Sequence, residues 1–397
     1  MKLADRLSQI QPSPTLALAA RARNLKAQGQ DVVDFSVGEP DLDSPDVAKD
    51  AAIRAIREGF TKYTASSGID ELKAAIADKL RLENGLEYAK NAIIVSCGAK
   101  HTLYNIAQAL YNPGDEVLIP APYWVSYPDQ LRLAGAVPVF VPTNESDGYA
   151  LHADLVAERI TPRTRAIILN SPCNPTGSAY TRADLEAIAQ LALRHSLWII
   201  SDEIYEHFAY DGFHPVSIAA LSRELQARTV VVNGVSKAFS MTGWRIGYAA
   251  APPELVAAMD AIQSQSTSNP TSISQKAAIG ALRDGRPFTD HMVAEFDRRR
   301  RFVVERLNKI AGVSCPLPRG AFYAFPNVSG CFDRRAGDRA LDSAAAVAAY
   351  LLDQAQVVVV PGEPFGAPQH VRLSYAASLD TLKKGLDRIE TALARLT

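Results

Sequence analysis

Lys237 stands at the end of a short apolar run, within residues 229–247, TVVVNGVSKAFSMTGWRIG. An amine at the end of a buried strand loses hydration, and Arg245 places a second cation eight residues later. Both effects lower the pKa of a lysine, and an unprotonated lysine can form a Schiff base with a carbonyl carbon. A lone lysine is usually a surface charge, but this strand context favours the chemical interpretation.

A second candidate, Asp202, directly follows the apolar residues 198–201, WIIS. A carboxylate buried there needs a positive partner, and the protonated ring nitrogen of a cofactor would serve. Tyr205 follows three residues later, where it can lie on the same side. The alternative is that Asp202 caps the N-terminus of a helix, a role that aspartate fills well.

Gly98, Ala99 and Lys100 precede a predicted helix, HTLYNIAQAL. The free N–H groups and the dipole at a helix start favour an anion such as phosphate. The alternative is a plain strand-to-helix turn. The dinucleotide-binding glycine pattern and the P-loop pattern are both absent, which argues against a dehydrogenase and against a bound nucleotide.

These candidates follow apolar runs that alternate with helical patterns. The runs are AIIVSCGA, EVLIPAPYW, AIILNSPCNPTG, LWIISDE and TVVVNGVSK. Short, wholly apolar runs between helices predict an α/β fold whose mostly parallel sheet is covered on both faces. Ligands of such sheets bind beyond the carboxyl ends of the strands, which is where the candidates stand.

The pattern changes after the long helix EFDRRRRFVVERLNKI to shorter strands and helices. We therefore predict a large α/β domain over residues 46–290 and a smaller α+β domain over residues 291–397. The N-terminal segment, residues 1–45, is predicted to pack with the small domain.

Composition excludes several classes of function. The 397 residues contain 42 basic and 43 acidic side chains, so neither nucleic acid nor an anionic membrane is a predicted partner. The four cysteines lack the spacing of a metal site or a disulfide framework, and we predict no metal. The charged, proline-containing N-terminus is unlike a signal peptide, so a cytoplasmic location is expected.

A phosphate site, a buried carboxylate and a Schiff-base lysine together describe a site for pyridoxal 5′-phosphate (PLP). The chain closely resembles the class I (fold type I) PLP-dependent aminotransferases, and among them the bacterial aspartate aminotransferase subgroup Ib. The resemblance covers nearly the whole chain and is carried by FSVGEPD, KYTASSG, GDEVLIPAPYWVSYP, NSPCNPTG, SDEIYEHF, SKAFSMTGWRIG, GAFYAFP and VRLSYA. It implies the fold of that family, with a seven-stranded type of sheet.

The resemblance also implies roles for individual residues. Lys237 would hold PLP as a Schiff base and then move the proton between substrate and cofactor. Asp202 would keep the pyridine nitrogen protonated, Asn174 and Tyr205 would hydrogen-bond the 3-oxygen, and Trp124 would stack on the ring. The phosphate would be bound by Gly98, Ala99, Lys100 and Arg245.

Further roles implied by the resemblance concern the substrate and a second subunit. Arg372 would clamp the substrate α-carboxylate, and its apolar neighbours Val371 and Leu373 predict that it points to the opposite face of its strand. The alternative is a surface arginine. The backbone of Gly38 would lie over the same carboxylate, because glycine permits close approach. Tyr63 would reach the other subunit's cofactor, which implies a homodimer with shared active sites.

The implied substrates are an amino acid and a 2-oxo acid, transaminated by a ping-pong exchange between L-aspartate and 2-oxoglutarate. Relatives direct a lysine at the distal carboxylate of aspartate, and Lys100 occupies that place, whereas the alternative is that it points to solvent. Trp124 and Asn174 would also line the substrate site.

Aromatic or neutral amino acids remain alternatives, and Gln11 stands where many relatives carry a basic residue, which weakens the case for prephenate. A β-lyase is more remote. A PLP-dependent regulator is equally remote, because the matching motifs begin by residue 36 and leave no room for a DNA-binding domain.

Overall fold

A computed structural model describes residues 3–337 and 339–397, so the first two residues of the predicted N-terminal segment lie outside the described residues. Among the described residues, the main sheet has seven strands in the spatial order β2-β8-β7-β6-β5-β3-β4. These strands are β2 (Ile93–Ser96), β3 (Glu116–Ala121), β4 (Val137–Pro142), β5 (Thr164–Asn170), β6 (Trp198–Asp202), β7 (Thr229–Gly234) and β8 (Gly247–Ala250). Strands β3 to β7 pair in parallel, whereas β8 runs antiparallel to β2 and β7. The predicted α/β fold with a mostly parallel sheet is confirmed.

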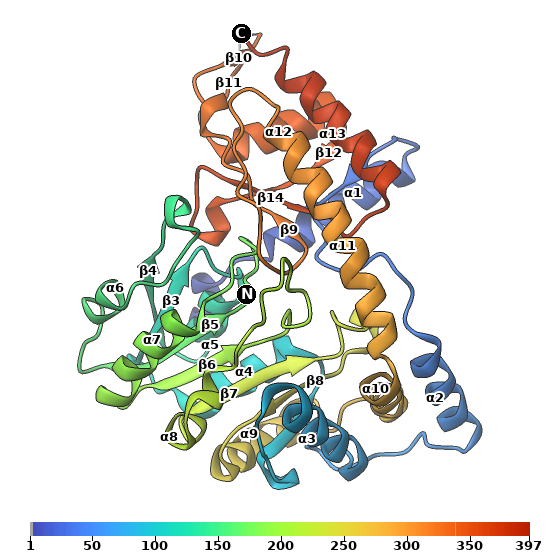
Figure 1. The fold of residues 1–397 in the computed structure, drawn as a ribbon, viewed down its shortest axis with the longest axis vertical. Helices are drawn as coiled ribbons and strands as arrows, with labels where there is room; N and C mark the ends of the chain where they lie inside the picture. The colour runs from blue at the N-terminus through green and yellow to red at the C-terminus, as the bar shows by residue number, and fades with distance from the viewer. Residues whose placement is uncertain (1–2, 338) are drawn as a thin grey trace.

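Helices cover both faces of the main sheet (Figure 1). One face packs on α4 (Ala99–Leu110), α5 (Ser126–Leu133) and α9 (Pro253–Ser266). The other packs on α2 (Asp46–Arg57), α3 (Asp70–Asn84), α6 (Ala153–Ala157), α7 (Arg182–Arg194), α8 (Arg223–Gln226) and α10 (Ser272–Asp284). Successive strand residues serve opposite faces, since Ile199 packs with α7 and Ile200 with α4. Burial on both faces explains why the strands read as unbroken apolar runs.

The C-terminal elements form a second group of packed layers. They are α11 (Arg286–Leu307), β9 (Tyr323–Ala324), β10 (Arg335–Ala336), β11 (Arg339–Ala340), α12 (Ala344–Ala355), β12 (Val357–Val358), β13 (Val360–Pro361), β14 (Val371–Ser374) and α13 (Leu379–Leu393). Strands β13, β14 and β9 form an antiparallel sheet of their own. Figure 1 shows α11 running from beside α10 up to α12 and α13.

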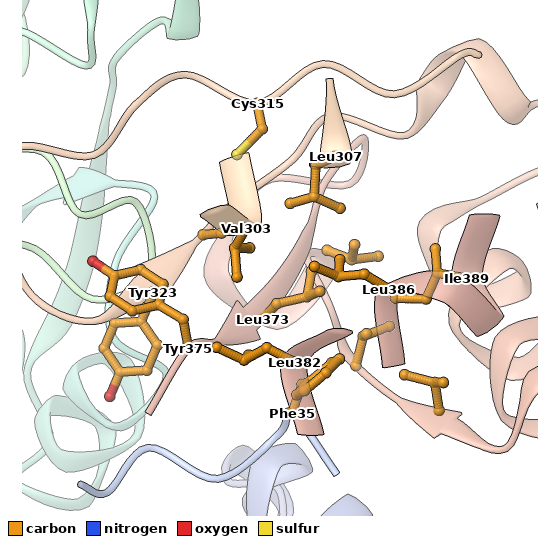
Figure 2. Packing of buried hydrophobic residues seen from close by; sticks show 14 of the residues in the cluster. Phe35, Val303, Leu307, Cys315, Tyr323, Leu373, Tyr375, Leu382, Leu386 and Ile389 are labelled. Atoms are coloured by element: carbon orange, nitrogen blue, oxygen red, sulfur yellow. The ribbon is translucent and has the colours of Figure 1, made fainter. Parts of the chain in front are cut away.

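Two N-terminal elements, α1 (Pro14–Ala27) and β1 (Val33–Asp34), pack against this C-terminal group. The 3-10 helix that precedes them (Asp5–Gln9) instead contacts α5, beside the main sheet. Strand β1 pairs in parallel with β12, and Phe35 is buried in the C-terminal core with Leu373 and Leu386 (Figure 2). No helix of the described residues combines the length and the apolar character that a membrane span requires.

Sheet topology brings the ends of several strands to one edge. Asn170 ends β5 and lies opposite Asp202 at the end of β6. Because β8 is antiparallel to both β7 and β2, the latter two run in the same direction, and Ser96 ends β2 at the same edge. The residues that follow these strands are therefore near one another, although they are up to 140 positions apart in the sequence.

Candidate active site

A cavity of about 360 Å³ lies between this sheet edge and strands β9 and β14. Its lining includes most of the predicted site residues: Gly38, Ala99, Lys100, Trp124, Asn174, Asp202, Tyr205, Lys237, Arg245 and Arg372. Gly98 lies immediately behind the cavity, against the side chain of Arg245. Most of the residues singled out from the sequence therefore meet in one cavity, which is lined both by residues near the main sheet and by residues of the C-terminal layers.

Lys237 lies in the turn after β7, and its Nζ donates a hydrogen bond of 2.5 Å to the carbonyl oxygen of Gly38. Burial lowers the pKa of Lys237 to about 8, although the exposed carboxylate of Glu39 acts in the opposite direction. Arg372 and Arg245 lower this pKa further. The amine is therefore poised to lose its proton near neutral pH, as a nucleophile requires.

Asp202 is buried at the end of β6, with 4 % of its surface exposed. Its Oδ2 accepts a hydrogen bond of 2.6 Å from the Tyr127 hydroxyl, and its Oδ1 accepts one of 3.3 Å from the Ile204 amide. Burial raises the pKa of Asp202 to about 6, and these hydrogen bonds oppose the rise. The residues that follow Asp202, 204–207, form a turn and not a helix, so the helix-capping alternative is wrong. The buried carboxylate retains the capacity to pair with a cation.

Arg372 on β14 is 2 % exposed and turns its guanidinium into the cavity. Nη1 donates to Asn174 Oδ1 at 2.9 Å and Nη2 to the Ser36 carbonyl at 2.7 Å, while the buried Nε has no hydrogen-bond partner. The flanking Val371 and Leu373 join the C-terminal core, on the other face of the strand. The alternative of a surface arginine is therefore wrong. A buried guanidinium with an unused N–H can bind a carboxylate.

The start of α4 and Arg245 form the other end of the cavity. Gly98 has φ of +87°, and a Cβ at this position would come within 2.3 Å of Arg245 Nη2, so glycine is needed for this approach. The Arg245 side chain is exposed, and its Nη1 donates to the Thr242 carbonyl at 2.9 Å. Helix N–H groups beside a guanidinium suit a phosphate.

Lys100, in the first turn of α4, is exposed and also lines the cavity. Its Nζ lies 5.0 Å from the centroid of the Trp124 ring. Burial of part of the side chain and the nearby Arg245 lower the pKa of Lys100. The Trp124 ring in turn meets Tyr127 edge-on, with centroids 5.3 Å apart. Lys100 therefore presents its charge both to solvent and to the cavity.

Tyr63 is a predicted site residue that has no contact role in the cavity of its own chain. Its side chain is 92 % exposed, and it does not line the cavity. An exposed aromatic residue is compatible with a contact to another molecule.

Sequence reasoning missed several residues of the site. Tyr127, which donates a hydrogen bond to Asp202, lies at the end of the motif GDEVLIPAPYWVSYP. Only its position on α5 in the structure reveals this role. Tyr323 is buried beneath Arg372, and no local signal distinguishes it from a core aromatic. Ser13 and Thr15, from the segment around α1, close one side of the cavity.

Comparison with known proteins identifies the family. Residues 30–389 match the family described as aminotransferase class I and II. The chain belongs to this family. The aminotransferase is 49% identical over 389 residues to an aspartate aminotransferase of Geobacillus stearothermophilus, and this match covers 98% of each of the two chains. It is also 49% identical over 397 residues to an aspartate/prephenate aminotransferase of Cereibacter sphaeroides, covering 100% of this chain and 99% of the relative.

A solved structure agrees with these comparisons. The aspartate aminotransferase of Rhizobium meliloti superposes with a TM-score of 0.96 at 45% identity, and the match covers 100% of both chains. The predicted resemblance to class I aminotransferases is confirmed.

Family membership implies PLP as cofactor, and the cavity of this aminotransferase fits that group. A buried carboxylate, Asp202, can pair with a protonated ring nitrogen, while Arg245 and the start of α4 supply an anion site. Lys237, with its lowered pKa, lines the same cavity. The three chemical features of PLP thus each have a complementary group.

Proposed function

We propose that this aminotransferase exchanges the amino group between L-aspartate and 2-oxoglutarate, in a ping-pong reaction that yields oxaloacetate and L-glutamate. One observation carries the proposal: besides Arg245 at the phosphate end, a single cavity holds a lysine of lowered pKa and two further cations, Arg372 and Lys100. An amino acid with two carboxylates matches both cations. The names of the relatives support the same substrate.

PLP, when bound, supplies an electron-accepting ring that makes the Cα–H bond of an attached amino acid acidic. Lys237 is the residue that would hold the cofactor and afterwards accept and return the Cα proton. Its amine has a pKa of about 8, so it can take up and release a proton at physiological pH. Asp202 would hold the ring nitrogen in its protonated form, with Tyr127 fixing the carboxylate in place.

Asn174 and Tyr205 would donate hydrogen bonds to the 3-oxygen of the cofactor, and Trp124 would cover the ring. Asn174 is fixed by its neighbour, since its backbone amide donates to Asn170 Oδ1 at 2.9 Å. Asn170 Nδ2 in turn donates to the carbonyl of Asp202 at 3.0 Å. The two groups that would meet the cofactor ring are thereby held in one rigid network.

Two cations would orient the substrate. Arg372 would bind the α-carboxylate through Nε and a terminal nitrogen, because Nε has no partner and the planar fork matches a carboxylate. Lys100 would bind the distal carboxylate. The backbone of Gly38 and the side chains of Ser13 and Thr15 would cover the substrate and exclude water.

We further propose that the enzyme works as a homodimer in the cytoplasm. Tyr63, exposed in one chain, would reach the phosphate of the cofactor held by the partner subunit. The cytoplasmic location is supported by four cysteines that are all free, as a reducing compartment favours.

Replacement of the distal cation tests the substrate assignment. In Lys100→Gln, we expect kcat/KM for aspartate to fall by about tenfold to a hundredfold, because a hydrogen bond between charged groups is lost. The kcat/KM for alanine, which has no distal carboxylate, should stay nearly unchanged. Lys309→Gln is the matched control, since Lys309 pairs with Glu305 on the surface. An equal fall for both substrates would contradict the assignment.

Prephenate is the second candidate substrate, because one relative is named an aspartate/prephenate aminotransferase. Gln11 lies with Lys100 and Arg245 at a neighbouring cavity of about 430 Å³. Without a positive charge at Gln11, the enzyme is expected to use prephenate less well than 2-oxoglutarate as the amino-group acceptor. Comparison of kcat/KM for these two acceptors, each with aspartate as the donor, checks this order.

A further inference from the structure

Tyr323 lies between the two halves of the site: the cofactor half, represented by Tyr205, and the substrate half, represented by Arg372. Sequence reasoning gave it no role. It belongs to β9, is 1 % exposed, and pairs across the strands with Ser374 of β14. Its hydroxyl lies 2.8 Å from the hydroxyl of Tyr205, which follows β6 of the main sheet. One side chain of the C-terminal group therefore contacts directly the tyrosine that would bind the cofactor.

The ring of Tyr323 also supports the substrate arginine. The guanidinium carbon of Arg372 lies 4.6 Å from the ring centroid. A cation over an aromatic face is attracted to it, most strongly where water is excluded. The guanidinium is oriented by the rings of Tyr323 and Phe365 and by its hydrogen bonds to Asn174 and Ser36. The Nε of Arg372 adds no further hydrogen bond.

The backbone at Gly38 keeps the space that the Tyr323 hydroxyl needs. A Cβ on Gly38 would lie 2.5 Å from Tyr323 Oη. The carbonyl of the same glycine accepts the hydrogen bond from Lys237. The Tyr323 hydroxyl is therefore close to the groups that would surround the reacting amine, and it is held there by packing on two sides.

Chemistry favours one direction of donation between the two hydroxyls. Burial raises the pKa of Tyr205 well above its usual range, and the neighbouring Tyr323 adds to this rise. Burial also raises the pKa of Tyr323, and Arg372 acts to lower the pKa of both hydroxyls. The two hydroxyl oxygens lie 2.8 Å apart, and each hydroxyl has a single proton. If Tyr205 donates its proton to the cofactor's 3-oxygen, its oxygen can only accept from Tyr323, so Tyr323 is the donor of this pair. The proton of Tyr205 then remains free for another acceptor in the cavity.

We propose that Tyr323 is a positioning residue that acts on both halves of the site. Its hydroxyl donates to Tyr205 and makes Tyr205 a stronger donor to the cofactor's 3-oxygen, and its ring holds Arg372 ready for the substrate carboxylate. This inference rests on the proposed function, since it takes Tyr205 as a cofactor ligand and Arg372 as the substrate clamp.

The test of the hydroxyl compares the PLP-loaded wild type with Tyr323→Phe and with Tyr375→Phe. Tyr375 is the matched control because it is buried in the same core as Tyr323 (Figure 2). Its hydroxyl donates to the Ala321 carbonyl at 3.1 Å, and Tyr375 does not line the cavity. The readout is the pH midpoint of the visible absorption band of the PLP–lysine linkage. A weaker Tyr205 donor should raise this midpoint by about half a pH unit in Tyr323→Phe. Tyr375→Phe should match the wild type.

The test of the ring measures the dissociation constant of succinate, a dicarboxylate without an amino group. Tyr323→Phe keeps the ring and should bind succinate as the wild type does, whereas Tyr323→Leu should bind about tenfold more weakly. Equal midpoints in wild type and Tyr323→Phe would overturn the hydroxyl role, and unchanged succinate binding in Tyr323→Leu would overturn the ring role. A wild type without a lysine-dependent band would instead overturn the proposed function and the inference with it.

Discussion

At the scale of single residues, the chemistry depends on how burial changes the acidity of a few groups. Lys237 would ordinarily be charged up to pH 10.5, but burial lowers its pKa to about 8. The charged amine is therefore disfavoured in the folded protein. Between pH 8 and 10.5 the unfolded chain binds more protons at this residue than the folded chain does. This lysine thus makes the cofactor-free protein more stable as the pH rises through that window.

The same pKa predicts how fast the cofactor-free enzyme captures PLP. The rate should rise about tenfold per pH unit below pH 8 and level off above it, because only the neutral amine attacks a carbonyl. Stopped-flow absorbance at the band of the PLP–lysine linkage measures this rate, and Lys237→Ala should give no such band. A rate that continues to rise to pH 10 would show that Lys237 has the pKa of an exposed lysine.

The sequence allowed prediction of those site residues that carry their own chemical signal. Lys237, Asp202 and the start of α4 could be singled out because an ionisable group or a glycine follows a buried strand. Tyr323 could not, because its role arises from contacts with residues 118 positions earlier and 49 positions later. The buried position of Arg372 could be predicted only through its apolar neighbours.

At the scale of elements, one buried ion pair fixes the turn that carries Tyr205. Lys79 of α3 forms an ion pair with Glu206, the residue after Tyr205, and its Nζ lies 3.5 Å from Glu83. Asn84 Nδ2 donates to the other oxygen of Glu206 at 2.7 Å. Although burial opposes ionisation, Lys79 holds the pKa of Glu206 below its usual range. Helix α3 is therefore tied to the turn at the end of β6.

Removal of this lysine should destabilise the fold strongly. We expect Lys79→Met to lower the free energy of unfolding by about 3–5 kcal/mol, because Glu206 is left buried without its cation. Lys90→Met, which breaks an exposed pair with Asp70, should cost less than about 1 kcal/mol. Urea denaturation followed by circular dichroism measures both. Similar values for the two variants would contradict this account of the α3 contact.

Strand prediction worked where burial is complete and failed at the margins of the sheet. The five apolar runs correspond to β2, β3, β5, β6 and β7. Strand β4 was not anticipated because it lies at the sheet edge, carries Pro138 and Pro142, and is partly exposed. Strand β8 has only four residues, GYAA, which lack the bulky apolar pattern of a strand.

At the scale of the whole molecule, the site is complete only where the main sheet meets the C-terminal layers. Arg372 and Tyr323 come from β14 and β9, whereas Asp202 ends β6 of the main sheet and Tyr205 and Lys237 follow strands of that sheet. The order of the layers along the chain is visible in the sequence. The domain limits at residues 45 and 290 stay a prediction.

The proposed dimer can be tested by subunit mixing. Lys237→Ala and Tyr63→Ala should each be impaired, and unfolding and refolding them together should restore part of the activity. A mixed dimer has one site with both Lys237 and the partner subunit's Tyr63, so about half of the dimers should each gain one intact site. Activity equal to the mean of the two separate variants would show that Tyr63 does not act across subunits.

The central claim is that Lys237 holds PLP in a site built for a dicarboxylic amino acid. The most direct measurement is the absorption spectrum of the purified PLP-loaded enzyme on addition of aspartate, and separately of phenylalanine, without any oxo acid. We predict that aspartate replaces the PLP–lysine band with the shorter-wavelength band of the aminated cofactor. Phenylalanine should need at least about tenfold higher concentration. Equal conversion by both amino acids would contradict the dicarboxylate assignment, and absence of the initial band would contradict the role of Lys237.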